Sequence, residues 1–267
     1  KTHSVTDQST RKANVEYKFI LDRSETDLPF VLGQELEIEW TGNIFCTSCG
    51  AKTPKSYSQG HCFKCFKTKA ECDLCIMKPE TCHYHLGTCR EPDWADSHCF
   101  MPHVVYLANS SGIKVGITRK TQIPTRWLDQ GAMQALPIFE VANRRLAGLI
   151  EVAIAQHIPD KTQWQRLLKA DAEALDLLAI KADVLSLCQV ELAEIANQYP
   201  QQIRLLDNQS YDFNFPVLQY PSKIKAFNFD NQGQISGVLQ GIKGQYLILD
   251  TGVINIRKFG GYEVEFS

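Results

Sequence analysis

The sequence predicts an α+β protein with a metal-stapled cysteine-rich module, a small three-stranded antiparallel sheet with helices, and a C-terminal β barrel. Nine of the ten cysteines lie between Cys46 and Cys99, several in pairs with the spacing of metal ligands. Residues 103–157 hold two apolar runs around a turn, a helical pattern, a third strand and a second helix. Residues 223–266 divide into five short apolar runs separated by turn residues, as in SH3-like or OB-like barrels.

These patterns divide the chain into four regions. We predict an N-terminal β segment at 1–45, a cysteine-rich zinc-binding module at 46–102, an α/β core with a helical extension at 103–200, and an SH3-like or OB-like β domain at 201–267.

The composition is that of an ordinary globular protein, with 44% hydrophobic and 22% charged residues. No apolar run has the length of a membrane span, and the first residues do not form a signal-peptide pattern. Without an export signal, clustered cysteines favour metal binding over disulfides. We therefore expect a bacterial, cytoplasmic protein with no membrane partner.

The net charge of −2 conceals a basic middle region. Residues 46–150 contain 13 Lys and Arg against 8 Asp and Glu, whereas both flanking regions are acidic. A basic surface around the cysteines and the hairpin would suffice for phosphate contacts, so DNA or RNA is the expected partner. The alternative is an incidental imbalance on a solvated surface.

Two CxxC pairs predict a first zinc site. Cys46 and Cys49 form one pair, Cys62 and Cys65 the other, and two such turns supply the four thiolates of a tetrahedral site. Gly50 directly follows the first pair and suits the left-handed backbone of such a turn. This spacing is typical of a zinc ribbon.

A second cluster predicts a second metal site whose ligands the spacing does not fix. Four thiolates are expected from five candidates, with Cys72 and Cys75 the firmest, Cys89 and Cys99 next, and Cys82 close behind. Four histidines lie within or just beyond the cluster. Either zinc or an iron–sulfur cluster is compatible with these residues. Cys188, within an amphipathic helix, is expected to be a core thiol.

The remaining elements follow from periodicity. Residues 15–21 and 36–40 alternate as strands that form their own sheet or complete one with the C-terminus. A helix is predicted at 172–198, as one long helix or a broken pair, and another opens at Asp160, with Gln163 at the capping-box position. The other predicted elements are a hairpin at 104–108 and 113–119, helices at 122–131 and 145–157, a strand at 137–142, and strands at 223–230, 235–240, 246–250, 253–257 and 262–266.

Glu151 is an isolated carboxylate on an otherwise apolar helix. The residues one turn away on either side are Ala147, Gly148, Ile154 and Ala155. Burying a carboxylate there is costly without a cation, and Arg126 or a divalent metal would supply one. The alternative is a purely structural ion pair.

In order along the chain, these motifs are Val-Val-Tyr106, a hairpin, Lys114-Val-Gly116-Ile-Thr118, a helical Arg126, a third strand and a helical Glu151. This order resembles the core of GIY-YIG nucleases, in particular the phage-type variant whose second motif begins with lysine. Together with the cysteine-rich module and the glycine-rich β tail, nearly the whole chain also resembles an uncharacterised bacterial domain family.

The nuclease resemblance implies a role for each matching residue. Tyr106 would contact or activate the attacking water, Arg126 would bind the scissile phosphate, and Glu151 would hold one Mg²⁺ or Mn²⁺. Further substrate contacts would come from Lys114, Gly116, Thr118 and Arg119. Lys114 stands where most members have a second tyrosine, and the sequence has no match for the Asn that often follows the metal-binding Glu.

Three functions are compatible with the sequence. The leading hypothesis is a metal-dependent phosphodiesterase, endonuclease-like, acting on DNA or RNA, with the zinc module and the β barrel positioning the substrate. The first alternative is a non-catalytic, zinc-containing nucleic-acid-binding protein. The second is an RNA-modifying or redox enzyme with an iron–sulfur cluster at the second cysteine group.

Overall fold

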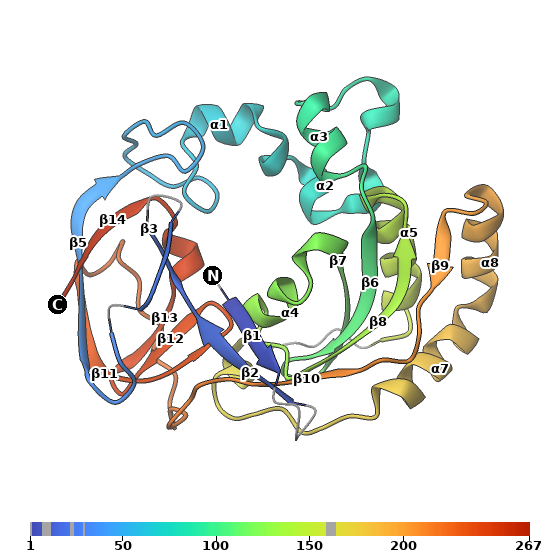
Figure 1. Ribbon diagram of the computed structural model, residues 1–267. Helices are drawn as coiled ribbons and strands as arrows, with labels where there is room; N and C mark the ends of the chain where they lie inside the picture. The colour runs from blue at the N-terminus through green and yellow to red at the C-terminus, as the bar shows by residue number, and fades with distance from the viewer. Residues whose placement is uncertain (1, 7–11, 22–23, 29, 159–163) are drawn as a thin grey trace.

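The computed structural model describes residues 2–6, 12–21, 24–28, 30–158 and 164–267. It is an α+β structure with a seven-stranded sheet, a five-stranded sheet and a two-stranded ribbon. The two large sheets lie on opposite sides of the molecule, and the cysteine-rich segment lies across the top, between them (Figure 1).

The seven-stranded sheet is built around β6 (His103–Asn109). Its neighbours β7 (Ile113–Arg119) and β8 (Gln134–Val141) both pair with it antiparallel, so the three predicted strands are adjacent as expected, but they belong to a seven-stranded sheet rather than a three-stranded one. Every residue of β6 is buried, because strands flank it on both edges and other elements cover both faces. The sheet order is β1-β2-β10-β8-β6-β7, with β9 also pairing β8; the added strands are β1 (Thr2–Thr6), β2 (Lys12–Tyr17), β9 (Ile203–Leu205) and β10 (Tyr211–Asn214).

Three helices bury one face of this sheet. Val105 and Leu107 pack against Ile150 of α5 (Arg144–Ala155) in the largest apolar cluster. The same cluster includes side chains of α7 (Leu177–Leu187) and α8 (Gln189–Gln198), so the helical pattern at 172–198 is a broken pair. Cys188 is fully buried at the junction of the pair, as expected for a core thiol.

The opposite face of the sheet carries α4 (Thr125–Asp129), whose Trp127 packs against Tyr106. The helix predicted to open at Asp160 begins within residues that the structure does not describe. Its described part is α6 (Trp164–Leu167).

The five-stranded sheet has the order β13-β12-β11-β5-β14, with β13 and β14 at its two edges. It is not a closed barrel, and this corrects the predicted C-terminal barrel. Residues 223–230 do not form a strand beyond one isolated bridge at Ala226; Phe227 and Phe229 instead pack into the core of the sheet. The strands are β5 (Glu35–Ile44), β11 (Gln234–Lys243), β12 (Tyr246–Leu249), β13 (Gly252–Asn255) and β14 (Tyr262–Phe266).

The N-terminal segment is shared between the sheets rather than forming a unit of its own. Strands β1 and β2 extend the seven-stranded sheet, whereas β5 lies in the other sheet between β11 and the edge strand β14. Completion of a C-terminal sheet was one of the two predicted alternatives for residues 36–40. The small ribbon between them pairs β3 (Phe19–Leu21) with β4 (Ser24–Thr26).

The cysteine-rich module consists of short helical turns. It contains α1 (Phe63–Thr68), α2 (Leu74–Met77) and α3 (Pro92–His98), with 3-10 turns η1 (Ala70–Cys72), η2 (Pro79–Thr81) and η3 (Tyr84–Leu86). Two further 3-10 turns are η4 (Lys120–Gln122) and η5 (Ile256–Phe259). No helix in the described part of the chain is both long and apolar enough to cross a bilayer.

Candidate functional site

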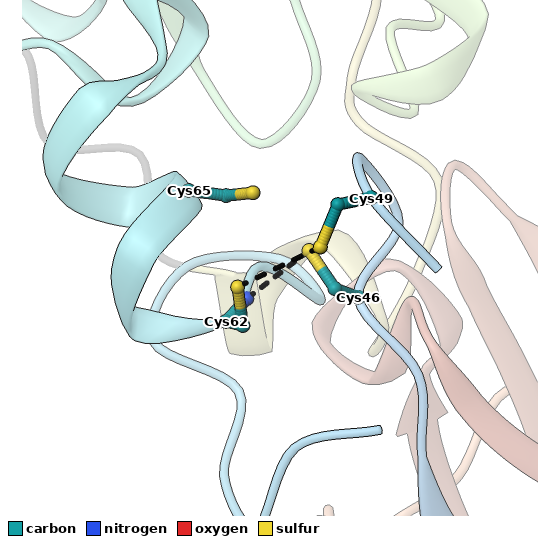
Figure 2. A group of neighbouring side chains, drawn as sticks. All are labelled: Cys46, Cys49, Cys62 and Cys65. Atoms are coloured by element: carbon teal, nitrogen blue, oxygen red, sulfur yellow. Dashed lines mark hydrogen bonds between the residues drawn. The ribbon is translucent and has the colours of Figure 1, made fainter. Parts of the chain in front are cut away.

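The first cysteine group has the geometry of a metal site. Cys46 and Cys49 lie on the turn that follows β5, Cys62 caps the start of α1, and Cys65 lies within that helix. The four Sγ atoms all lie within 4.8 Å of one another, and the side chains point toward a common centre (Figure 2). The Sγ atoms of Cys49 and Cys62 are 3.9 Å apart. Four sulfurs about 2.3 Å from a tetrahedral zinc ion would be about 3.8 Å apart, so the group fits zinc.

The turn also favours the deprotonated form of Cys46. Burial alone would raise the pKa of Cys46, but backbone N–H groups of Cys62, Cys49 and Ser48 lower this pKa to about 6. One of these contacts runs from the Cys62 N–H to the Cys46 Sγ, at 3.3 Å. Because a metal binds the deprotonated thiol, these amides favour binding.

The five candidate ligands of the second cluster do not all lie at one cavity. Cys75, Cys82, Cys89 and Cys99 line one small cavity, and Cys72 is not among the lining residues. The structure therefore distinguishes Cys72, which the sequence placed among the firmest ligands, from the other four.

Tyr106 is completely buried beside Arg126. Its phenol donates a hydrogen bond to Gln130 Oε1 at 3.1 Å, and burial raises its pKa to about 12 against the lowering effect of the Arg126 guanidinium. The Glu151 carboxylate adds to this rise. The phenol therefore stays protonated at neutral pH, which makes it a hydrogen-bond donor rather than a base.

Gly116 lies directly across from Tyr106 in the β6–β7 pair. A Cβ at Gly116 would be 2.9 Å from both Cζ and the hydroxyl oxygen of Tyr106. The absence of a side chain at Gly116 thus makes room for the ring of Tyr106.

Two further arginines, from separate segments, lie within electrostatic range of Arg126. Burial lowers the pKa of Arg144, at the start of α5, and the Arg126 guanidinium lowers it further, whereas Cys99 and Glu151 raise it. Desolvation lowers the pKa of Arg257, in η5, and Arg126 again adds to the effect. We call Arg126, Arg144 and Arg257 the arginine cluster.

Glu151 is half-buried on α5 and lines a cavity of about 250 Å³. Glu80 and Lys78 line the same cavity, and neither Tyr106 nor Arg126 does. The structure thus brings Glu151 within electrostatic range of Tyr106 while its adjoining cavity opens toward η2.

The residues that were expected to contact the substrate have different surroundings in the structure. Thr118 is 4% exposed, and its hydroxyl donates to the carbonyl oxygen of Arg119, so it is not available to a ligand as placed. Arg119 lies near the second cysteine cluster, where it lowers the pKa values of Cys99 and His103. Lys114 is half-buried on β7, next to Val115 at the edge of the sheet.

Three residues of this site were missed from the sequence. Arg257 belongs to the C-terminal sheet, and Glu80 belongs to the cysteine-rich module, so no local pattern connects either residue with Tyr106. Arg144 carries a detectable pattern, because it directly follows Asn143, whose side chain accepts a hydrogen bond from the Leu146 N–H and caps α5.

Fold and site together define an α+β protein with a tetracysteine group that could hold a metal such as zinc, and with Arg126 and Glu151 within electrostatic range of a buried tyrosine. The chain belongs to the family described as "Protein of unknown function (DUF2797)", which matches residues 33–264. No curated protein and no solved structure matches the chain. The resemblance of residues 104–151 to GIY-YIG nucleases therefore remains a prediction.

Proposed function

We propose that this protein is a metal-dependent phosphodiesterase acting on DNA or RNA, with its reaction centre at Tyr106, Arg126 and Glu151. The observation that carries the proposal is the arginine cluster, in which Arg144 and Arg257 each lie within electrostatic range of Arg126, and Glu151 lies within range of Arg144. Several guanidinium groups near one another attract an anion, and a phosphodiester is such an anion.

Each residue has a role in this proposal. Arg126 binds the scissile phosphate and neutralises the negative charge that develops in the transition state, and Arg257 and Arg144 contact neighbouring phosphate oxygens. Tyr106, as a protonated phenol, holds Arg126 and Gln130 in place and donates a hydrogen bond. Lys114 orients the backbone phosphate as a point charge.

Glu151 and Glu80 would hold the Mg²⁺ or Mn²⁺ ion. Carboxylate oxygens are the ligands that these ions prefer, and the 250 Å³ cavity between the two residues has room for an ion with its waters. Such an ion supplies Lewis-acid stabilisation of charge on the phosphate oxygens. Zinc at the first cysteine group would have a structural role, because four thiolates leave no open coordination position.

A second candidate is non-catalytic binding of nucleic acid, and one surface favours it. Tyr57, Phe63 and Phe66 are exposed together around α1, with ring centroids 5.1 Å apart for Tyr57–Phe63 and 6.3 Å for Tyr57–Phe66. The ammonium groups of Lys55 and Lys67 lie over two of these rings. Exposed aromatic rings beside lysines bind bases and phosphates of single strands.

The test is cleavage of labelled single- and double-stranded DNA and RNA with Mg²⁺ or Mn²⁺. We expect Glu151→Gln to abolish cleavage and to leave binding within about threefold, whereas Glu194→Gln, a matched change on the exposed face of α8, leaves both unchanged. Binding without cleavage by the unaltered protein under either metal would reject the phosphodiesterase and leave the second candidate. Absence of binding would reject both.

A further inference from the structure

Four thiols of the second cluster surround one small cavity. Cys75 comes from α2, Cys82 and Cys89 come from the residues on either side of η3, and Cys99 directly follows α3. The cavity has a volume of about 20 Å³, close to the space of one water-sized sphere, and Asp73 and His83 also line it.

We propose that Cys75, Cys82, Cys89 and Cys99 hold a second zinc ion, and that Cys72 is not a ligand. Four thiolates around a space for one ion are the donor set of a closed, structural zinc site. The size of the cavity favours a single ion over an iron–sulfur cluster, which contains several iron and sulfide atoms.

The surroundings of the thiols support this division. Cys82, Cys89 and Cys99 all lie within electrostatic range of the Cys75 thiol. Thiolates this close would repel one another, and a cation at the centre would remove that cost.

Cys72 has different neighbours. The ionisable groups nearest to it are Glu71, Arg90, Cys46 and Glu91, none of them a cysteine of the second group. It lies at the end of η1, between the two cysteine groups.

Asp73 and His83 are the competing donors, since their ligand atoms lie within 4.8 Å of the Cys75 sulfur and of each other. Asp73 is already engaged, because Arg90 Nε lies 2.7 Å from one of its oxygens and the Cys75 N–H donates to the other. His83 Nδ1 lies 2.7 Å from the Thr88 hydroxyl, and His83 Nε2 is 3.6 Å from Asp73. Both residues thus fit as an outer shell that orients the ligands.

A zinc ion at this site would stabilise the packing of residues 75–99 on α5, the helix that carries Glu151. The Arg144 N–H donates to the Cys99 carbonyl at 2.8 Å, and Arg144 Nη2 donates to the Ile76 carbonyl at 2.7 Å. Farther along α5, a Cβ at Gly148 would be 2.7 Å from the Glu80 nitrogen. Residues 75–99 therefore pack closely on α5, although short turns alone bury too little apolar surface to stay ordered.

The test measures zinc per chain in protein purified from zinc-supplemented medium, and it does not depend on any activity. We expect two equivalents in the unaltered protein and in Cys72→Ser, and one equivalent in Cys82→Ser and in Cys89→Ser. His83→Gln, which removes the competing donor, should keep two. Loss of zinc from Cys72→Ser or His83→Gln, a single equivalent in the unaltered protein, or iron with sulfide in place of zinc would overturn the proposal.

Cobalt substitution covers the case in which a serine variant does not fold. The unaltered protein reconstituted with two equivalents of Co²⁺ should show thiolate-to-cobalt charge-transfer absorption of equal intensity for each equivalent, because both sites have four thiolates. A second equivalent with markedly weaker absorption would indicate oxygen or nitrogen ligands and would overturn the four-thiolate assignment.

Discussion

The cysteine-rich module and the seven-stranded sheet are stabilised by different means. The sheet packs an apolar cluster on each of its two faces, with β6 buried along its length. The module has few buried apolar side chains and many short turns, and its buried cysteines face candidate metal centres. The difference teaches that one part of this fold depends on burial and the other on its thiolate ligands, so the two should respond to different perturbations.

The largest effect is expected from metal removal. A zinc chelator should unfold residues 46–99 while the pairing of β6, β7 and β8 persists, because structural zinc contributes about 10 kcal/mol or more to small sites. Hydrogen exchange resolved by peptide measures this. If the sheet lost its protection together with the module, the two parts would not be independent.

Leu107→Ala should destabilise the seven-stranded sheet and leave the cysteine-rich module intact. Leu107 is completely buried against the helices of the largest cluster, and removal of such a side chain costs about 2–5 kcal/mol. We expect a lower midpoint of denaturant unfolding with unchanged zinc content. Loss of zinc from this variant would contradict the separation.

Acid should act on the sheet through His103. Burial lowers the pKa of His103 to about 4, opposed by a hydrogen bond with the Met101 carbonyl and reinforced by Arg144 and Arg119. Because the pKa is lower in the folded state than the usual 6.5, its contribution to stability is complete above pH 6.5 and is lost as the pH falls toward 4, by up to about 3 kcal/mol.

The measurement is the free energy of unfolding at several pH values for the unaltered protein and for His103→Gln, which does not titrate. The variant should lose less stability between pH 6.5 and 4. Equal losses in both proteins would show that acid acts through the thiolates of the module alone.

Gly116→Ala is expected to have the smallest effect on stability and a specific effect on the candidate site. The new methyl group would meet the ring of Tyr106 at 2.9 Å, and such overpacking costs about 1–3 kcal/mol. Phosphate or nucleic-acid affinity should fall with it, because Tyr106 adjoins Arg126, whereas Gly233→Ala, in the loop before β11, has open space and leaves affinity unchanged. Equal affinities in both variants would show that the position of Tyr106 does not affect binding.

Local patterns predicted much of this molecule, and long-range contacts limited the rest. The pairs Cys46–Cys49 and Cys62–Cys65 were predictable because two ligands on one tight turn must face the same way. The hairpin and the helix of Glu151 followed from periodicity. In contrast, Cys75, Cys82, Cys89 and Cys99 have irregular spacing, so only the fold shows that these four line one cavity.

The C-terminal sheet shows the same limit. Phe227 and Phe229 alternate as in a strand, yet they cover the sheet instead of joining it, and periodicity does not distinguish these two outcomes. The place that they were expected to fill is taken by β5, from the other end of the chain. Arg257 was missed for the same reason, since it reaches the arginine cluster through tertiary structure alone.

The pairing of β5 with β14 has a consequence for the order of biosynthesis. Ile38 pairs with Phe266, and the Phe45 N–H donates to the Gly261 carbonyl beside the first cysteine turn. The five-stranded sheet that contains residues 35–44 therefore cannot be completed until more than 200 further residues have been synthesised. During that interval β5 has an unpaired edge next to four free thiols, so early zinc capture at Cys46, Cys49, Cys62 and Cys65 would protect the nascent chain from aggregation and oxidation.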